Sequence, residues 1–518
     1  MDEDGYACIR HFNIYPPANL NDPVYFPSYW NESVPPIQFG LHQHCQWLVS
    51  VPEGLYATAV FYKDAVEATV YLNYANNEAE ELLNNDHAPF MLTAPMFQID
   101  LFKSNTAGAF SFKIIWSKYP KIDRKSVALK KSGLPFAGIP NPYLTTFQAE
   151  TSVSLVAFGL KNESRNALLR QSAVYDGNST NGLFMGNLFK LMMEGKEVIT
   201  RGSALTIYTF GLHEEFNYTL FMVQDHSNDP GYLRYQGVNC ISDSQCPIML
   251  NARFGETAVA TADSHPEYIT GFYSFPEYST LKIYEGMISE PTLVATLNET
   301  NYLNWLPMKL KMTMRHYVVD SGNVTFSISR DPSIVNWNTM YDGRKAFAHS
   351  SFYGFLCDQQ DINETFTTSN SQRLFFNYIV TSADFTDSQT YLTVVVFLEG
   401  NIVLSETYNS TNPPPKSVWS MQGDKFQNFH AFDLTFAFNN YSKNYTCSYN
   451  VKYYENFNSK NSSIYKTLRI QQLHNKTINS PNNTHNSFNN EHAKEANFYP
   501  TNNAIFNSLH FDNISVVS

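Results

Sequence analysis

The sequence predicts an all-β protein made of tandem jelly-roll β-sandwich modules, followed by a disordered, asparagine-rich tail. Three observations predict this class. Aromatic residues reach 15% while charged residues make up only 16% of 518 residues, against roughly a quarter charged in average soluble proteins. Alternation of apolar and polar residues with a period of two dominates the chain, which is typical of strands with one buried face. This alternation also recurs at a spacing that matches the size of a small domain.

The recurring unit is an alternating strand, a polar loop and a second alternating strand, which predicts a β-hairpin. Its four copies cover residues 97–116, 205–222, 310–328 and 432–451, and their first residues lie 108, 105 and 122 positions apart. A sheet with one apolar face must bury that face against another layer. Each unit of about 110 residues is therefore predicted to be a two-sheet sandwich with a core of its own.

The domain boundaries follow from the repeat and from changes in composition. We predict sandwich modules at residues 8–118, 146–229, 235–330 and, on a looser pattern, 340–455. Residues 119–145 are basic and contain Pro and Gly, so they are predicted to form a linker. Residues 456–518 hold 15 Asn and few apolar residues, which predicts a disordered tail. Short helices are expected at residues 77–86 and 184–195.

Charge and hydropathy exclude two classes of partner. The formal net charge of −12 disfavours binding to the phosphate backbone of nucleic acids. No apolar run approaches the 18 or so residues that a membrane-spanning helix needs. The start of the chain, MDEDGY, is acidic and is not a signal peptide. We therefore expect either a truncated gene model of a secreted protein or an intracellular protein, and we favour the former.

Six cysteines, an even number, are compatible with disulfide bonds in an oxidising compartment. Six cysteines allow 15 pairings, and the sequence does not choose among them. If each module closes its own bridge, the pairs are Cys8–Cys45, Cys240–Cys246 and Cys357–Cys447. No C-x-x-C pairs are spaced for a zinc ribbon or a redox site.

The chain is also rich in N-x-S/T sequons, which accept N-glycans in secreted proteins. Fourteen occur, where about 8 are expected by chance. They begin at Asn31, Asn162, Asn178, Asn217, Asn298, Asn323, Asn363, Asn409, Asn440, Asn444, Asn461, Asn475, Asn482 and Asn513. Together with the cysteines, these sequons predict an extracellular protein, with attachment to the cell surface as the alternative location.

The N-terminal segment carries a resemblance to a known family. Residues 16–30 read PPANLNDPVYFPSYW, and they are followed by Cys45-Gln46-Trp47 and by VPEGLYA at 51–57. This combination resembles the nematode secreted CUB-like domain proteins. Looser echoes occur at residues 174–178 and 281–286. The resemblance implies a jelly-roll sandwich, secretion from intestinal or epidermal cells, a role in the response to pathogens and stress, and no enzymatic activity.

Many CUB domains bind calcium through one Glu and two Asp around an acidic-Gly turn, with one Asp about five residues upstream of that turn. This sequence has Gln171 and Thr280 at the two upstream positions. Asp320 could supply one further ligand at most, whereas calcium takes six or more oxygen ligands. The sequence therefore predicts no calcium site and no other cofactor.

Other candidate sites have simpler explanations. His42 and His44 share a strand face beside Cys45, but no third zinc ligand is identifiable, so two exposed histidines are expected. Glu78, Glu80 and Glu81, near Asp86, are expected to form a solvated acidic surface. The many Tyr residues could stack on sugar rings, but most lie in alternating strands and are expected to pack between sheets. We find no H-E-x-x-H, G-x-S-x-G or P-loop motif.

These observations favour a secreted, glycosylated, multi-module protein that binds a protein or glycan ligand at the host–pathogen surface, in innate immunity or defense against stress, without catalysis. A structural matrix protein or a membrane-surface adhesion protein is the alternative, and an unrecognised hydrolase is the third hypothesis. No sequon lies between residues 34 and 161. The first module is therefore where an uncovered binding face is expected, since loops and faces on a rigid scaffold carry recognition.

Overall fold

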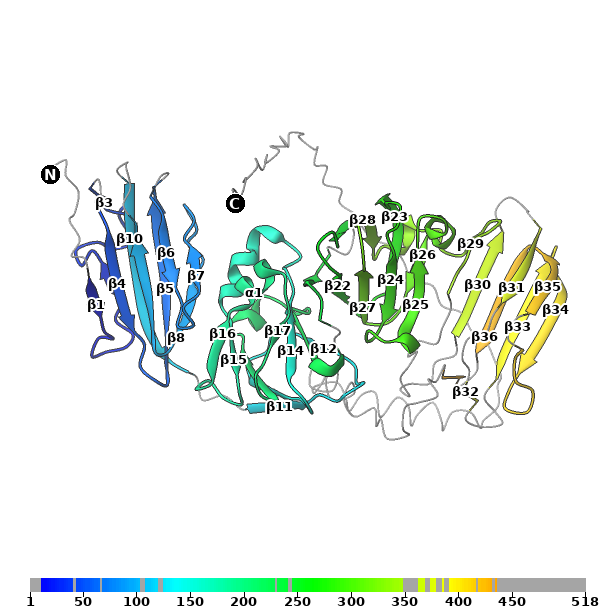
Figure 1. The fold of residues 1–518 in the computed structure, drawn as a ribbon, viewed down its shortest axis with the longest axis horizontal. Coiled ribbons are helices and arrows are strands. Elements are labelled where there is room, and N and C mark those ends of the chain that lie inside the picture. Colours follow the sequence, from blue (N-terminus) through cyan, green and yellow to red (C-terminus); the bar gives the residue numbers. More distant parts are fainter. Residues whose placement is uncertain are drawn as a thin grey trace, which may run out of the picture. The chain divides into compact units, whose positions relative to one another are not determined.

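The computed structural model describes residues 11–40, 43–65, 68–102, 108–119, 124–228, 231–240, 245–347, 362–368, 373–378, 384–385, 391–415, 418–430 and 434–435. These residues are mostly β-strands, and they form tandem β-sandwich modules, as the sequence predicts. Residues 1–446 belong to a single compact unit. In Figure 1 the strands of the modules follow one another in colour from blue to yellow.

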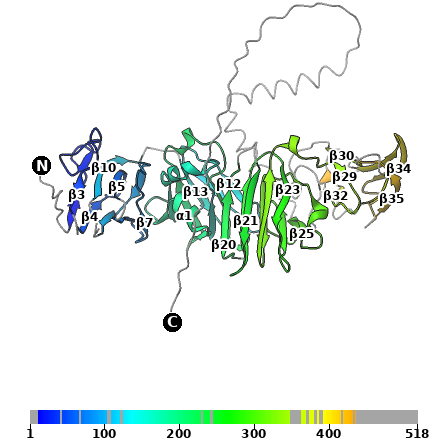
Figure 2. The same cartoon turned by 90° about the horizontal axis from the view of Figure 1, so that it is seen from above.

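Module 1 comprises strands β1 to β10. One sheet has the order β1-β4-β9-β6-β7, and the other has the order β2-β10-β5-β8, with β3 also pairing with β10. In Figure 2, β4 of the first sheet is seen apart from β10 and β5, which belong to the second sheet. The strands are β1 (Phe12–Ile14), β2 (Val24–Phe26), β3 (Gln38–Phe39), β4 (Cys45–Ser50), β5 (Leu55–Asp64), β6 (Val70–Asn73), β7 (Ala79–Glu81), β8 (Phe90–Thr93), β9 (Met96–Leu101) and β10 (Gly108–Lys118).

Module 2 contains most of the helical residues. Its sheets have the orders β11-β13-β18-β15-β16 and β12-β19-β14-β17. The strands are β11 (Arg124–Ala128), β12 (Phe136–Gly138), β13 (Leu144–Gln148), β14 (Val153–Ala157), β15 (Ala173–Asp176), β16 (Leu183–Gly186), β17 (Val198–Ile199), β18 (Ala204–Tyr208) and β19 (Phe221–Asp225). The helices are α1 (Leu188–Glu194) and the 3-10 helices η1 (Glu163–Arg170), η2 (Leu212–Glu214) and η3 (His226–Asn228).

Module 3 has the sheet orders β20-β22-β27-β24-β25 and β21-β28-β23-β26. Its strands are β20 (Arg234–Val238), β21 (Cys246–Asn251), β22 (Thr257–Ala262), β23 (Glu267–Ser274), β24 (Leu281–Glu285), β25 (Leu293–Leu297), β26 (Met308–Leu310), β27 (Met314–Val319) and β28 (Asn323–Ser329). The 3-10 helices η4 (Glu290–Thr292), η5 (Tyr302–Trp305) and η6 (Pro332–Ile334) lie in or after it.

Module 4 is described in part. Its five-stranded sheet has the order β29-β30-β36-β33-β34, and two short pairs, β31-β35 and β32-β37, accompany it. The strands are β29 (Thr339–Met340), β30 (Ile362–Thr368), β31 (Leu374–Tyr378), β32 (Asp384–Phe385), β33 (Leu392–Leu398), β34 (Asn401–Tyr408), β35 (Val418–Gly423), β36 (Lys425–His430) and β37 (Leu434–Thr435).

The modules repeat one topology. If module 1's extra strand β3 is set aside, the nine strands of modules 1, 2 and 3 connect in the same order, and each five-stranded sheet begins with a parallel edge pair. The five-stranded sheet of module 4 has the same order and the same parallel edge pair. The equivalent strands β9, β18, β27 and β36 start 108, 110 and 111 residues apart. The structure is thus more regular than the spacing in the sequence.

The prediction that these strands pair as hairpins is wrong. The two strands of each predicted pair occur in modules 1 to 3, but they lie in opposite sheets and do not pair with each other: β9 with β10, β18 with β19, and β27 with β28. Both strands bury alternate residues in one core, so the sequence pattern is the same as that of a hairpin. The third copy begins across the end of β26, and most of the fourth lies outside the described residues.

Two other expectations differ from the structure. Residues 119–145 contain β11, β12 and the start of β13, which are strands of module 2 and not a strand-poor linker. The first predicted helix, 77–86, contains β7 instead, whereas the second, 184–195, contains α1. The α1 helix begins at the N-cap Asn187, whose side chain accepts from the backbone N–H of Lys190, and it ends at Gly195 in the left-handed conformation. The predicted tail lies outside the described residues.

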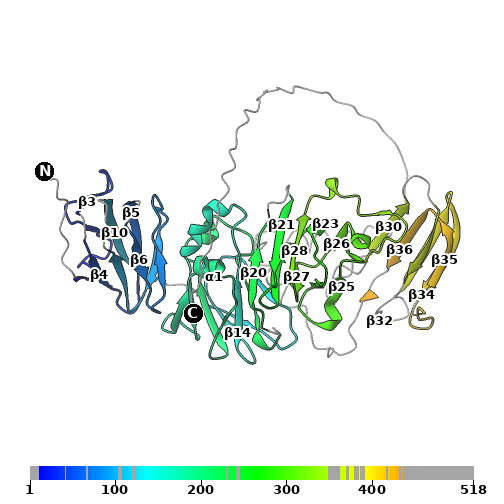
Figure 3. The ribbon, with the colours of Figure 1, turned by 45° about the horizontal axis from the view of Figure 1, so that its top comes forward.

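The module cores are continuous across their junctions. The module 1 core, around Trp47 and Trp116, includes Tyr175 and Tyr208 from module 2. A second cluster joins β14 and β19 of module 2 to β22 and β27 of module 3. Figure 3 shows β20 beside β14, where Phe158 and Gly237 form an isolated parallel bridge. The expectation that each module has a core of its own is therefore wrong at these junctions.

Candidate functional site

The outer face of the module 1 sheet β1-β4-β9-β6-β7 carries a regular grid of polar and aromatic side chains. Alternate residues of β4, β9 and β6 point into the core, so the intervening residues form the outer face. Strand register places Gln46, Asp100 and Tyr71 in one row. The next row holds Leu48, Gln98 and Asn73. We call these six residues, together with His44 and Phe102 at one end, the amide face.

Asp100 is the centre of the amide face. The residue is 7% exposed, and its carboxylate accepts hydrogen bonds from three neighbouring amides. Gln46 Nε2 lies 3.0 Å from one carboxylate oxygen, and Asn73 Nδ2 lies 2.6 Å from the other. Gln98 Nε2 lies 2.9 and 2.7 Å from the two oxygens. The carboxylate therefore fixes the orientation of all three amide groups, because each donates an N–H to it.

An aromatic group lies at the end of the grid. The rings of His44 and Phe102 are stacked, with centroids 5.3 Å apart and an interplanar angle of 21°. Tyr71 meets Phe102 edge-on at 5.5 Å. Phe102 is 44% exposed, and His11 Nδ1 donates to Gln46 Oε1 at 2.5 Å on the opposite flank. The amide face thus combines fixed amides with an exposed ring stack.

The charge of this sheet is one-sided. The five strands β1, β4, β9, β6 and β7 contain no Lys or Arg, whereas they contain Asp100, Glu80 and Glu81. An anionic ligand would therefore find no cation on these strands to pair with. The amide face is therefore unsuited to anionic groups.

The opposite sheet of module 1 lies beneath the first sequon. Trp30 is buried against Tyr62, with ring centroids 4.9 Å apart. Glu32 pairs with Lys113 on β10 at 2.8 Å. The hydrogen bond from Lys113 lowers the pKa of Glu32, while burial and the Glu32 contact raise the pKa of Tyr62 to about 12. Asn31 is exposed within this segment. A glycan there would rise over the second sheet, not over the amide face.

The predicted sequons lie mostly on the surface. Asn31, Asn162, Asn178, Asn217 and Asn298 are exposed, whereas Asn323 and Asn409 are half-buried. At Asn162, Asn298 and Asn409 the sequon hydroxyl donates to the Asn Oδ1 at 2.8 Å. The side chain of Asn363 is not described, and the other predicted sequons, Asn440, Asn444, Asn461, Asn475, Asn482 and Asn513, lie outside the described residues. Glycosylation of these sites stays a prediction.

The cysteines that the structure describes are disulfide-bonded. Cys240 and Cys246 are joined, and the bond connects the segment after β20 to the start of β21. Cys45 is also disulfide-bonded. Cys8, Cys357 and Cys447 lie outside the described residues, so the remaining pairings stay predictions.

The expectation that Glu78, Glu80 and Glu81, near Asp86, form a solvated acidic surface is wrong for Glu80 and Asp86, whereas Glu81 is exposed. Instead of facing solvent, Glu80 and Asp86 pair with Arg170, which comes from η1 of module 2 and is 1% exposed. Lys190 of α1 pairs with Glu78 at 2.5 Å. The acidic residues therefore hold module 1 against module 2. The sequence gives no sign of this pairing, because Arg170 lies 84 positions after Asp86.

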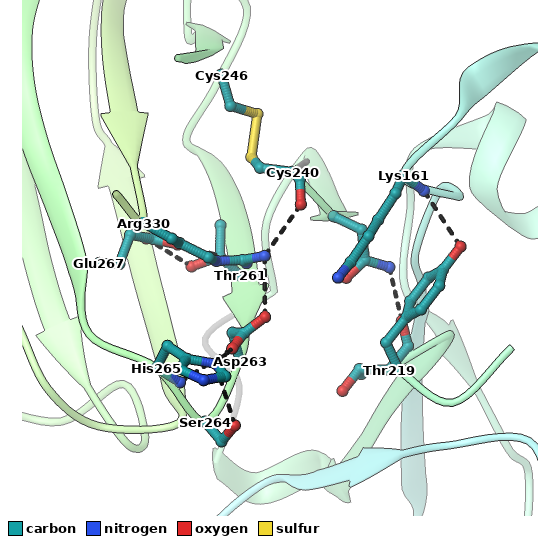
Figure 4. Close-up of polar contacts among 12 residues, drawn as sticks. Lys161, Thr219, Cys240, Cys246, Thr261, Asp263, Ser264, His265, Glu267 and Arg330 are labelled. Atoms are coloured by element: carbon teal, nitrogen blue, oxygen red, sulfur yellow. Dashed lines mark hydrogen bonds and ion pairs between the residues drawn. A yellow bond between two sulfur atoms is a disulfide. The ribbon is translucent and has the colours of Figure 1, made fainter. Parts of the chain in front are cut away.

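A second buried charge cluster lies in module 3 (Figure 4). Arg330 pairs with Asp263 at 3.0 Å and with Glu267 at 3.6 Å, and it donates to the backbone oxygen of Cys240 at 3.1 Å. Burial raises the pKa of Asp263, but the hydrogen bond from the His265 backbone and the charge of Arg330 bring it below its ordinary value. Arg330 thus ties the disulfide segment to the end of β28. We assign this cluster to stability, since its carboxylates already have cationic partners.

Other titratable groups at the module 2–3 junction are also internal. His316 of β27 is fully buried; its Nε2 donates to the Gly286 oxygen at 3.0 Å, and Tyr235 donates to its Nδ1 at 2.7 Å. Burial lowers the pKa of His316 to about 4, although the Gly286 contact favours the charged form. The ring is therefore neutral at pH 7.

The next feature is the metal site considered at His42, His44 and Cys45. Within the described ranges, no group of three or more His, Cys, Asp or Glu is placed to hold a metal ion. His44 stacks on Phe102, and His42 lies outside the described residues. In the same ranges, no helix has the length and apolarity needed to cross a membrane.

Comparison with known protein families finds a match for the residues of module 1. Residues 3–120 match the CUB-like domain. Module 1 is thus similar to the CUB-like domain, as the resemblance indicated. Residues 135–210 and 230–331 match two further families, each described as a domain of unknown function. No curated protein sequence matches the chain.

Three solved structures are similar to parts of the chain. The CUB1-EGF-CUB2 domains of rat MASP-1 match with 9% identity and a TM-score of 0.17, covering 42% of this chain and 100% of that one. The human MASP-1/3 CUB1-EGF-CUB2 domain matches with 10% identity and a TM-score of 0.16, covering 40% and 98%. The full extracellular region of zebrafish Gpr126/Adgrg6 matches with 10% identity and a TM-score of 0.17, covering 63% of this chain and 53% of that one. At these scores the matches add nothing to the assignment.

Sequence reasoning located the module but missed the amide face itself. Gln46, Asn73 and Gln98 are 27 and 25 positions apart, and only the register of three strands brings them to one carboxylate. The available signal was the alternation of β4 and β9, which identifies their outward residues but not the neighbours of those residues.

Proposed function

We propose that the chain is a secreted, glycosylated, multi-module binding protein that acts without catalysis, and that the amide face of its CUB-like module is the binding surface. Its predicted setting is the surface between host and microbe, in an innate immune or stress response. The tandem modules, with module 2 beginning at β11 (Arg124–Ala128), would act as a stiff support for this face.

One observation carries the proposal. The amide face combines exposed rings with oriented amides, and the five strands of its sheet contain no Lys or Arg. It lies within residues 34–161, the longest stretch of the four modules that is free of sequons. An evolved binding surface needs polar groups that are held in position before the ligand arrives. Asp100 meets this requirement, because it orients three amides without occupying their carbonyl oxygens.

Three further features support an extracellular location. The Cys240–Cys246 bridge is of a kind that persists in oxidising compartments. Five sequon asparagines are exposed where a glycan would meet solvent. The N-terminal module matches the CUB-like domain.

The alternative, a matrix or adhesion protein without a specific ligand, is favoured by the spread of exposed sequons over modules 1, 2 and 3. The two hypotheses differ in where contact occurs. A specific binder uses the uncovered face, whereas a matrix protein adheres through its whole coated surface.

Secretion of the full-length gene product, followed by removal of N-glycans, tests the extracellular part. We expect a mobility increase on glycosidase treatment and no reactive thiols at Cys240 and Cys246. An unglycosylated product whose thiols are free would contradict the proposal.

A further inference from the structure

We propose that the ligand of the amide face is a neutral carbohydrate, held by hydrogen bonds from the three amides and by stacking of a sugar ring on Phe102. This inference rests on the proposed function, and it names the class of ligand for the same surface.

The hydrogen-bonding capacity of the amides defines the first part of the argument. A primary amide has two N–H donors and one carbonyl acceptor. Gln46 and Asn73 each use one donor on Asp100, and Gln46 also accepts from His11. The carbonyl oxygens of Asn73 and Gln98 have no hydrogen bond among the described residues. The face therefore offers donors and acceptors side by side, which is what hydroxyl groups require because each can donate and accept.

The charges of the sheet argue against two other ligand classes. The five strands of this sheet carry no Lys or Arg, so sulfated, phosphorylated or sialylated ligands lack a counter-charge. Asp100 is 7% exposed, and both its oxygens already accept from amides, so a cationic group finds no open carboxylate at the centre. An exposed carboxylate, that of Glu81 on the edge strand β7, lies at the end of this row opposite Tyr71. The charges therefore favour an uncharged ligand at the centre of the face, and the lysine-rich peptide in the test below probes its acidic edge.

Ring geometry supplies the third step. His44 and Phe102 stack in a nearly parallel pair, and Tyr71 closes one side of it. Exposed aromatic faces bind flat apolar surfaces, and the axial C–H face of a pyranose is such a surface. The stack lies directly beside the row of Gln46, Asp100 and Tyr71, so one ligand can reach both.

The size of the amide face fits a short sugar. Three strands and three rows of outward residues span about 10 Å by about 13 Å at ordinary strand spacings. A standard protein–protein interface covers roughly 800 Å² on each partner, which is several times this area. Because the grid lies on the central strands of a paired sheet, binding would require little rearrangement.

The test uses the full-length secreted chain and defined probes. Laminarihexaose, mannohexaose and chitohexaose represent neutral sugars, while a sialylated oligosaccharide, a sulfated oligosaccharide and a lysine-rich peptide represent the disfavoured classes. We expect binding of at least one neutral hexasaccharide and none of the charged probes, measured by calorimetry or glycan array.

Two variants locate the site. Gln98→Leu removes one amide at similar volume, and Phe102→Ala removes the stacking ring; each is expected to weaken binding at least about tenfold. Gln148→Leu, on an exposed end of β13, and Tyr273→Ala, a 66% exposed ring in module 3, are matched controls that should leave binding unchanged. Thermal unfolding of all four variants separates loss of the site from loss of the fold.

The outcomes distinguish the two levels of the proposal. Failure of every neutral sugar to bind, or binding that neither Gln98→Leu nor Phe102→Ala weakens, overturns the carbohydrate assignment. If instead the lysine-rich peptide binds and the same two variants abolish its binding, the carbohydrate assignment fails while the amide face stands as the binding surface. Binding of any probe that only the control variants weaken refutes both.

Discussion

Replacing Arg170 by Met should weaken the junction between module 1 and module 2 at a measurable cost in stability. The guanidinium is 1% exposed and pairs with Glu80 and Asp86, whose side chains are 13% and 17% exposed. Its Nε donates to Glu80 at 2.7 Å, and the group lies 4.1 and 4.5 Å from the rings of Phe90 and Phe189. Removing it leaves two carboxylates without their cation in a largely buried site.

The expected magnitude follows from this burial. Breaking a buried ion pair by removing one partner costs about 3–5 kcal/mol, and loss of the two ring contacts adds about 1 kcal/mol or more. For a body of two modules, 1 kcal/mol shifts Tm by roughly 2–4 °C. The transition that reports these modules should therefore fall by at least about 6 °C in calorimetry of the full-length chain.

A neighbouring ion pair provides the control. Arg165 lies in the same 3-10 helix and pairs with Glu215, but both side chains are about half exposed, at 46% and 45%. Surface pairs contribute roughly 0.2–1 kcal/mol, so Arg165→Met should lower Tm by less than about 4 °C. Adding Glu80→Gln and Asp86→Asn to Arg170→Met should restore part of the loss. Equal small shifts for both arginine variants would refute the assignment of Arg170 as the junction clamp.

Three further predictions concern the other junction and the surface. Gly237→Ala would place a Cβ 2.0 Å from the ring of Phe158, so we expect a loss of about 1–3 kcal/mol in the free energy of unfolding. The control Gly271→Ala, whose Cβ would meet nothing within 4 Å, should change the free energy of unfolding much less. Equal losses for the two variants would contradict the close approach. Burial lowers the pKa of His316 to about 4. The contribution of its neutral ring to folding stability is therefore complete above pH 6.5, and up to about 3 kcal/mol of it is lost as the pH falls from 6.5 to 4. His316→Gln should flatten this pH dependence in thermal unfolding, and an unchanged slope would argue against it. Site-specific mass spectrometry should find glycans at the exposed sequons and lower occupancy at half-buried Asn323; full occupancy there would show that exposure does not control glycosylation in this chain.

The fold could be predicted because its main determinant is local. Alternation along β4, with Cys45 and Trp47 buried and Gln46 half-buried, is visible in the sequence and corresponds to one buried sheet face. The same alternation does not tell which layer holds the next strand, so β9 and β10 were predicted to pair although they face each other across a core.

Contacts between distant elements could not be predicted. Every residue of β22 (Thr257–Ala262) is buried, because its two faces pack against module 3's own core and against module 2. In the sequence this segment shows no clear alternation of apolar and polar residues, so the junction between modules 2 and 3 could not be predicted from it. The Arg170 clamp and the amide face are missed for the same reason: each depends on partners that only the register and the stacking of modules bring together.

Hydroxyl-radical footprinting of the full-length chain, with and without a bound ligand, tests the central claim most directly. The rings of His44, Tyr71 and Phe102 report the amide face, while Phe254 and Tyr278, which are 89% and 85% exposed in module 3, report a remote surface. We predict that the ligand protects the first three rings and leaves the other two as reactive as before. Protection of Phe254 and Tyr278 with no change at Tyr71 and Phe102 would contradict the account.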